Sequence, residues 1–214
     1  MKTTAIAVLL GLCGLGVLGV VLGFNNGPEL PTSPQEFRAW FEQEDNGFIR
    51  TKTIGAVTFA VQQRPAELMA ANEIFNSTVT AEAAAAIQDG YRNSRYFALR
   101  ISPTDAAGPQ AGDAMQAASL NFADYSDKIK YLSYHLQEHT QLVAGGDTIE
   151  PSIYHYERGY EANPVQTFLF AFPRMEDRAD DALTFIFNDP IFQAGRLKFR
   201  FDQEAQLVPE IPIH

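Results

Sequence analysis

The feature that most constrains this chain is an uncharged apolar run near its N-terminus. Thr3 to Phe24 reads TTAIAVLLGLCGLGVLGVVLGF and contains no Asp, Glu, Lys or Arg. A helix of about 22 residues, rising roughly 1.5 Å per residue, spans about 33 Å, close to the hydrocarbon thickness of a bilayer. We therefore expect residues 1–24 to form a membrane anchor or signal segment.

Three interpretations of this segment stay open. The apolar run is longer than the roughly 7–15 residues usual in cleaved signal peptides, which favours a retained single-pass anchor. Val21-Leu22-Gly23 offers a tolerable cleavage site for a signal peptide. In the third interpretation the chain is a lipoprotein acylated at Cys13, although Leu12 stands where such signals have a small residue and the apolar run continues well beyond Cys13.

Flanking charge predicts the orientation of the segment. Lys2 is the positive charge before the run, and the next one along the chain is Arg38. The positive-inside bias then places the N-terminus in the cytoplasm and exports residues 25–214.

Because Cys13 is the one cysteine, no intramolecular disulfide can form. An exported domain without disulfides favours a bacterial envelope.

The rest of the chain divides into a linker and one domain. Residues 25–33, NNGPELPTS, have linker composition, and residues 34–214 are long enough to bury a sizeable core. The 16 Lys and Arg against 26 Asp and Glu give a net charge of −10. This balance argues against a nucleic-acid partner and against adsorption to anionic lipid, because both need clustered cations.

The first half of the domain predicts helices around a few strands. Ser33, Pro34 and Glu36 are typical of a helix start. Phe37, Trp40 and Phe41 lie on one face of that helix, which we expect to pack on the domain's own sheet rather than to dock a partner. The further expected helices are 65–75, 80–90 and 113–122, and the expected strands are 48–62, as one or two strands, and 96–101.

Alternating aromatics dominate the second half, which we expect to be mostly β from residue 129 onward. Phenylalanines recur at every second position in residues 165–172, 183–187 and 197–201. This period predicts strands with one buried face, and their closeness in sequence predicts an antiparallel meander. The predicted fold class is α+β: an N-terminal transmembrane or signal helix, then a mostly antiparallel sheet or small sandwich partly covered by helices.

The sharpest chemical motif is His135-Leu136-Gln137-Glu138-His139. It resembles the H-x-x-E-H motif of inverted zinc proteases, and this resemblance covers only these five residues. On a helix both histidines could reach one zinc ion, and Glu138 could activate a bound water. The family needs a third ligand, for which Glu150, Glu157 or Glu161 are candidates. On a strand the two histidines would be about 13 Å apart and could share no metal. The local pattern fits a helix and a strand equally.

Two further clusters have plainer interpretations. His155 and Glu157 would share one face of a strand, either as an orienting pair in a catalytic site or, as we prefer, as a polar face paired with a basic neighbour such as Arg200. The Met175–Asp181 loop holds four carboxylates, which suit calcium, but its spacing is not that of an EF-hand and favours a solvated acidic turn.

These patterns contain no convergent catalytic set, so we predict no catalytic, cofactor-binding or metal-binding residues. The favoured function is a non-enzymatic, membrane-tethered structural or interaction subunit of a bacterial envelope, periplasmic or at the cell surface. Its expected partners are the membrane, through residues 3–24, and envelope proteins. The alternatives are a zinc-dependent hydrolase using His135, Glu138 and His139, and a ligand-binding lipoprotein acylated at Cys13.

Overall fold

The computed structural model describes residues 29–104, 113–157, 164–175, 182–203 and 206–212. The expected anchor, including Cys13, lies outside these residues, as do 176–181 of the acidic loop. Within the described part, no helix combines the length and the apolar character needed to cross a membrane.

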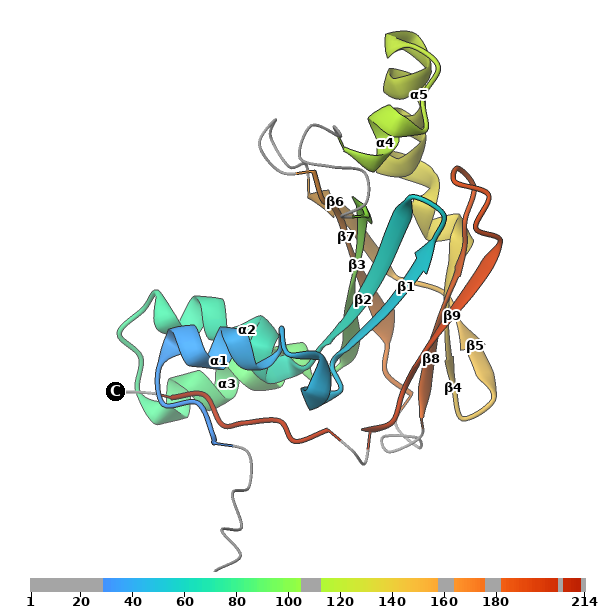
Figure 1. The fold of residues 1–214 in the computed structure, drawn as a ribbon. Coiled ribbons are helices and arrows are strands. Elements are labelled where there is room, and N and C mark those ends of the chain that lie inside the picture. Colours follow the sequence, from blue (N-terminus) through green and yellow to red (C-terminus); the bar gives the residue numbers. More distant parts are fainter. Residues whose placement is uncertain (1–28, 105–112, 158–163, 176–181, 204–205, 213–214) are drawn as a thin grey trace, which may run out of the picture.

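The described chain is α+β with two antiparallel sheets, as the sequence predicts at this level (Figure 1). The five-stranded sheet has the order β1 (Ile49–Ile54), β2 (Val57–Arg64), β3 (Ser94–Pro103), β7 (Gln166–Pro173), β6 (Ile153–Glu157). The four-stranded sheet has the order β5 (Asp147–Ile149), β4 (Thr140–Ala144), β8 (Leu183–Asn188), β9 (Arg196–Phe201).

Phenylalanine rings fill the space between the sheets. Phe97 on β3 meets Phe185 on β8 at a centroid distance of 5.4 Å, and Phe201 on β9 at 5.5 Å. Phe185 also lies 5.7 Å from Phe170 of β7. Residues of both sheets thus form one buried cluster, which makes the pair of sheets a sandwich.

The period-two aromatics are buried as predicted, but the predicted three-stranded meander is wrong. β8 pairs with β9, whereas β7 pairs with β3 and β6 in the opposite sheet. The alternation of apolar and polar side chains along each strand indicates only that one face of that strand is buried. It carries no information about which sheet supplies the neighbouring strand.

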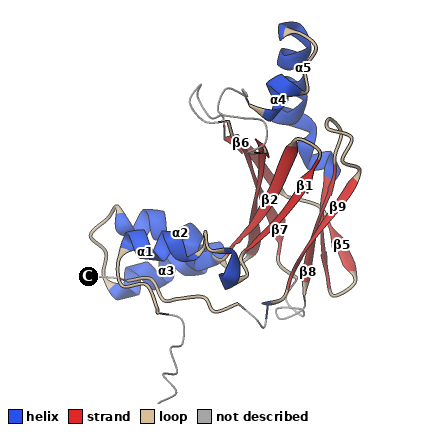
Figure 2. Cartoon of the chain, viewed as in Figure 1, coloured by secondary structure: helices blue, strands red, loops and turns tan. Residues whose placement is uncertain are grey.

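The helices gather at the two ends of the strands rather than lying across a sheet face (Figure 2). One end has α1 (Pro34–Trp40), α2 (Ala66–Phe75) and α3 (Ala81–Tyr91); the other has α4 (Ala114–Ala117) and α5 (Phe122–His135). Two short 3₁₀ helices, η1 (Glu44–Asn46) and η3 (Leu136–His139), follow α1 and α5.

The start of α1 is close to the prediction. The Ser33 hydroxyl accepts a hydrogen bond from the Glu36 backbone N–H at 3.2 Å, and the Glu36 carboxylate accepts from the Thr32 backbone N–H at 2.9 Å. Phe37, Trp40 and Phe41 are buried, as expected, but they pack with Phe48 and with α2 instead of lying on a sheet.

The expected single helix over 113–122 is instead the short α4, a turn, and the start of α5. The expectation of mostly β structure from residue 129 is confirmed only from Thr140 onward, because α5 continues to His135 and η3 to His139. Asn121 explains the later start, since its side chain accepts from the Asp124 backbone N–H at 3.0 Å and caps α5.

Replacing Phe185 by Ala should lower the free energy of unfolding by about 3–5 kcal/mol, because the lost ring leaves a cavity among four neighbouring rings. Phe122→Ala is the matched control, and the exposed ring should cost less than about 0.5 kcal/mol. Urea unfolding followed by tryptophan fluorescence measures both. Equal losses in the two variants would contradict the packing described here.

Candidate functional site

The most exposed apolar side chains of the described residues lie where α4 turns into α5. Leu120 is 93% exposed and Phe122 is 83% exposed. This α4–α5 hairpin projects beyond the ends of the strands, as Figure 1 shows. Exposed apolar side chains on a projection are typical of a contact surface, although two side chains make a small one.

Hydrogen bonds fix the turn beneath these side chains. The Asp124 carboxylate accepts from the Leu120 backbone N–H at 2.8 Å and from the Lys128 ammonium at 2.8 Å. Lys128 also donates to the Ala118 carbonyl at 2.6 Å. The hydrogen bond from Lys128, followed by that from Leu120, lowers the pKa of Asp124. The turn that presents Leu120 is therefore held by charged side chains on its own helix.

A second set of polar contacts attaches the hairpin to the sandwich. Tyr125 donates to the Asp113 carboxylate at 3.0 Å, and Gln166 of β7 donates to the same carboxylate oxygen at 3.0 Å. Tyr154 on β6 donates to the carbonyl of Leu132 in α5. Burial raises the pKa of Tyr154, which keeps the phenol protonated as this donor. These contacts hold the hairpin as an extension of the five-stranded sheet.

His135, Glu138 and His139 lie at the far end of α5. The α-helix ends at His135, so the two histidines do not share one face of a continuous α-helix, which the zinc hypothesis assumed. His135 Nδ1 is 2.9 Å from the Glu138 carboxylate. His139 Nε2 is 2.6 Å from the Tyr131 hydroxyl, and the Tyr131 ring stacks on His135 with centroids 5.2 Å apart.

The structure gathers no third ligand for these histidines among the residues it describes, where no group of three or more His, Cys, Asp or Glu is arranged to hold a metal. Of the nominated third ligands, Glu150 and Glu157 are described and Glu161 is not.

His155 and Glu157 lie on β6 and are exposed on one face of it, as the strand pattern predicts. The suggested pairing with Arg200 is wrong. Arg200 is on β9, in the other sheet, and its guanidinium contacts Asp202 at 3.0 Å. A basic side chain that does interact electrostatically with Glu157 is Arg64 of β2.

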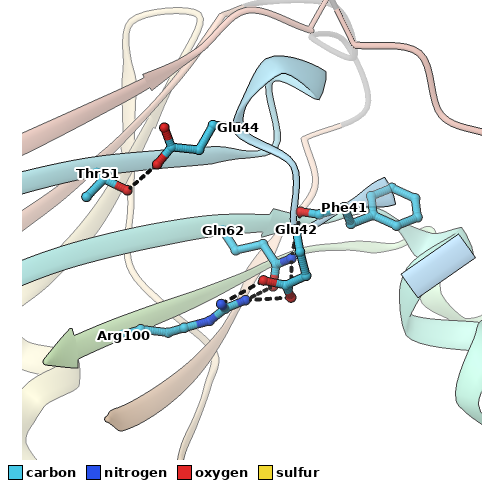
Figure 3. Close-up of polar contacts among 6 residues, drawn as sticks. All are labelled: Phe41, Glu42, Glu44, Thr51, Gln62 and Arg100. Carbon is cyan, nitrogen blue, oxygen red and sulfur yellow. Dashed lines mark hydrogen bonds and ion pairs between the residues drawn. The ribbon is translucent and has the colours of Figure 1, made fainter. Parts of the chain in front are cut away.

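A third polar cluster joins the segment after α1 to the five-stranded sheet (Figure 3). The Arg100 guanidinium binds the Glu42 carboxylate with two hydrogen bonds, at 2.7 and 2.8 Å. It also donates to the Gln62 side chain at 2.8 Å, and the Gln62 amide donates to the Phe41 carbonyl at 3.0 Å. Burial is the largest single effect and opposes ionisation of Glu42. The hydrogen bonds and charge of Arg100, the hydrogen bond from Gln62 and the charge of Arg64 together outweigh it and hold the carboxyl pKa below its ordinary value.

Every partner in this third cluster is another part of the fold, so its role is to attach α1 to the sheet. Sequence reasoning missed it because Glu42, Gln62 and Arg100 lie far apart along the chain. It also missed the exposed tip, because it expected a single helix over 113–122. The Asn121–Asp124 spacing was the available signal of a new helix start.

Comparison of the chain with protein-family models, with curated proteins and with solved structures finds no match.

Glu42→Gln should remove the pH dependence that this carboxylate gives to stability. Because the pKa is lowered on folding from 4.5, ionised Glu42 stabilises the fold above that pH, and the contribution is lost as the pH falls through the folded pKa. At neutral pH the half-exposed pair should contribute about 1 kcal/mol. Urea unfolding between about pH 3 and about pH 6 measures it. A variant with the wild-type pH profile would contradict the assignment.

Proposed function

We propose that this protein is a non-enzymatic interaction subunit of a bacterial envelope, tethered to the membrane by residues 3–24 with residues 25–214 exported. The main support for the proposal is the uncharged apolar run at residues 3–24, which is long enough to span a bilayer. The residues after it form a hydrophobic core of their own. The charge distribution around Lys2 supports the direction of export.

The arrangement of the body supports a role in contact with another protein. Glu29, the first described residue, lies beside α1, since it lines one pocket with residues of that helix. The α4–α5 hairpin lies at the end opposite to α1–α3 (Figure 1). A tether at residue 28 would therefore leave Leu120 and Phe122 at the end of the domain away from the attachment point. An apolar tip in that position suits a protein partner better than the membrane that holds the tether.

The polar clusters described above support a non-enzymatic role, because they connect parts of the fold. Glu42 and Arg100 attach α1, and Asp113 with Gln166 attaches the α4–α5 hairpin. His139 is engaged with Tyr131, and His135 with Glu138.

Deleting residues 1–24 should convert a membrane-bound protein into a soluble one with unchanged circular dichroism. Full-length protein should resist extraction from membranes by alkaline carbonate, and added protease should cleave it in spheroplasts. Cys13→Ser is the control that separates a helical anchor, which it leaves in place, from a lipid anchor, which it abolishes. Membrane association that survives the deletion would contradict the tether.

A photo-crosslinking residue at position 120 or 122 should give the same protein adduct in native membranes, because both positions face outward from one turn. The control position is Tyr134, which is 70% exposed on the same helix but lies near its other end. Adducts of identical size and yield at all three positions would show random collision and contradict a contact surface at the tip.

A further inference from the structure

The outer strand of the five-stranded sheet, β6, has an open edge. It pairs with β7 on one side, and no described strand pairs with its other side. The backbone N–H and C=O groups along such an edge can accept a further strand. The sheet's other edge strand, β1, lies against the second sheet, since Arg50 of β1 donates to the Arg200 carbonyl of β9 at 3.0 Å.

The sequence of β6 does not protect this edge. Natural edge strands are commonly kept from pairing by lysine, by proline or by being very short. β6 has five residues, IYHYE, and contains neither lysine nor proline, whereas β5 at an edge of the second sheet has three residues. Ile153 of β6 is 62% exposed and lines an apolar groove together with Leu169 and Ala171 of β7. An open edge with exposed apolar surface beside it is suited to strand addition.

The side chains of β6 divide between its two faces. Tyr154 and Tyr156 point toward the core, because the residues opposite them on β7 are the buried Phe170 and Phe168. The Tyr156 ring stacks on Phe168 with centroids 4.8 Å apart. The inner side chains of β6 are therefore engaged with their own fold.

His155 and Glu157 point to the outer face and are exposed. The outer face of this edge thus presents an imidazole and a carboxylate at alternate positions of one strand.

These two outer side chains make the edge complementary to itself. When β6 of a second copy lies antiparallel beside it, with Tyr156 opposite Tyr156, His155 of each copy lies opposite Glu157 of the other. Residues directly opposite in antiparallel strands have Cβ atoms about 4.5–5.5 Å apart, so an imidazole and a carboxylate can meet there. The two-fold axis of such a dimer forms this pair twice and brings the two Tyr156 side chains together at its centre.

We propose that β6 is a self-association edge, at which two copies of this chain pair their β6 strands antiparallel about Tyr156 and join their five-stranded sheets into one. The occupant is a second copy rather than an unrelated strand, because the charge pattern of the edge complements itself. The paired edge is only five residues long, so the dimer should be weak and reversible. The inference goes beyond the proposed function, because it depends on neither the tether nor the α4–α5 tip.

Sedimentation equilibrium of the full-length protein in a density-matched non-ionic detergent tests the dimer. The protein mass should rise from that of one copy toward that of two as the concentration increases over roughly 1 μM to 1 mM, which covers weak protein–protein affinities. A mass of one copy throughout this range overturns the proposal and leaves the tether unaffected.

Charge variants determine whether β6 forms the contact. His155→Glu sets two carboxylates opposite each other at both pairs, and should weaken dimerisation at least about tenfold. Combining His155→Glu with Glu157→His exchanges the two groups and restores both pairs, so this double variant should dimerise within about threefold of the wild type. The matched control is Thr53→Glu, which adds a carboxylate at an exposed position of β1, at the opposite edge of the same sheet.

The control should dimerise normally, and all variants should keep the wild-type circular dichroism, because the three positions are exposed. A dimer that His155→Glu leaves intact would be formed elsewhere on the molecule and overturns the proposal. A double variant that is as weak as His155→Glu alone overturns the pairing of His155 with Glu157.

Hydrogen exchange separates strand pairing from a dimer held by side chains alone. Backbone N–H groups of β6 should exchange more slowly at the highest protein concentration than at the lowest, because the added strand supplies acceptors along the edge. The exchange rates of β1 should not change with concentration. Exchange in β6 that is equally fast in monomer and dimer overturns the strand addition.

Discussion

The packing of phenylalanine rings between two antiparallel sheets is the interaction on which the rest of this structure depends. Twelve phenylalanines are fully buried in the described residues, and nine of them, such as Phe97 and Phe185, lie on strands whose side chains meet in one cluster. Each buried ring contributes about 2–3 kcal/mol of transfer free energy, with edge-to-face contacts adding to it. A ring is wide, so it bridges the gap of about 10 Å between sheets from either side.

The aromatic core between the sheets determines where the helices pack. Since the inner faces of both sheets are occupied, helices pack at the ends of the strands and need other means of attachment. The α1 segment uses an aromatic cluster of its own together with the Glu42–Arg100 pair. The α4–α5 hairpin uses tyrosine hydroxyls and the shared Asp113 carboxylate. Partly exposed polar contacts of this kind set the position of the attached segments more than they add stability.

Local patterns in the sequence predict most of the elements, and they fail where distant residues decide. The alternation in β7, β8 and β9 correctly indicates buried strand faces, and Ser33 correctly marks the start of α1. The assignment of β7 to the other sheet depends on its pairing with β3, which no local pattern records. Residues 129–135 fit both periods equally, and in the structure they are helical, with Leu132 buried in the core. The Glu42–Arg100 pair and the attachment of the α4–α5 hairpin depend in the same way on contacts between distant segments.

The register that buries the core also determines what lies at its ends. Along β2, Phe59 and Val61 point into the sandwich, so two residues later Gln63 points to the same side and Arg64 to the opposite one. Because β2 ends there and α2 begins, Arg64 is neither released to solvent nor given a hydrogen-bonded partner at Nε within the described fold. Arg64 is held in place by the same strand that supplies Phe59 to the core. The register of the core therefore places Arg64 on the outer face of the five-stranded sheet, where it interacts electrostatically with Glu157 and Glu42.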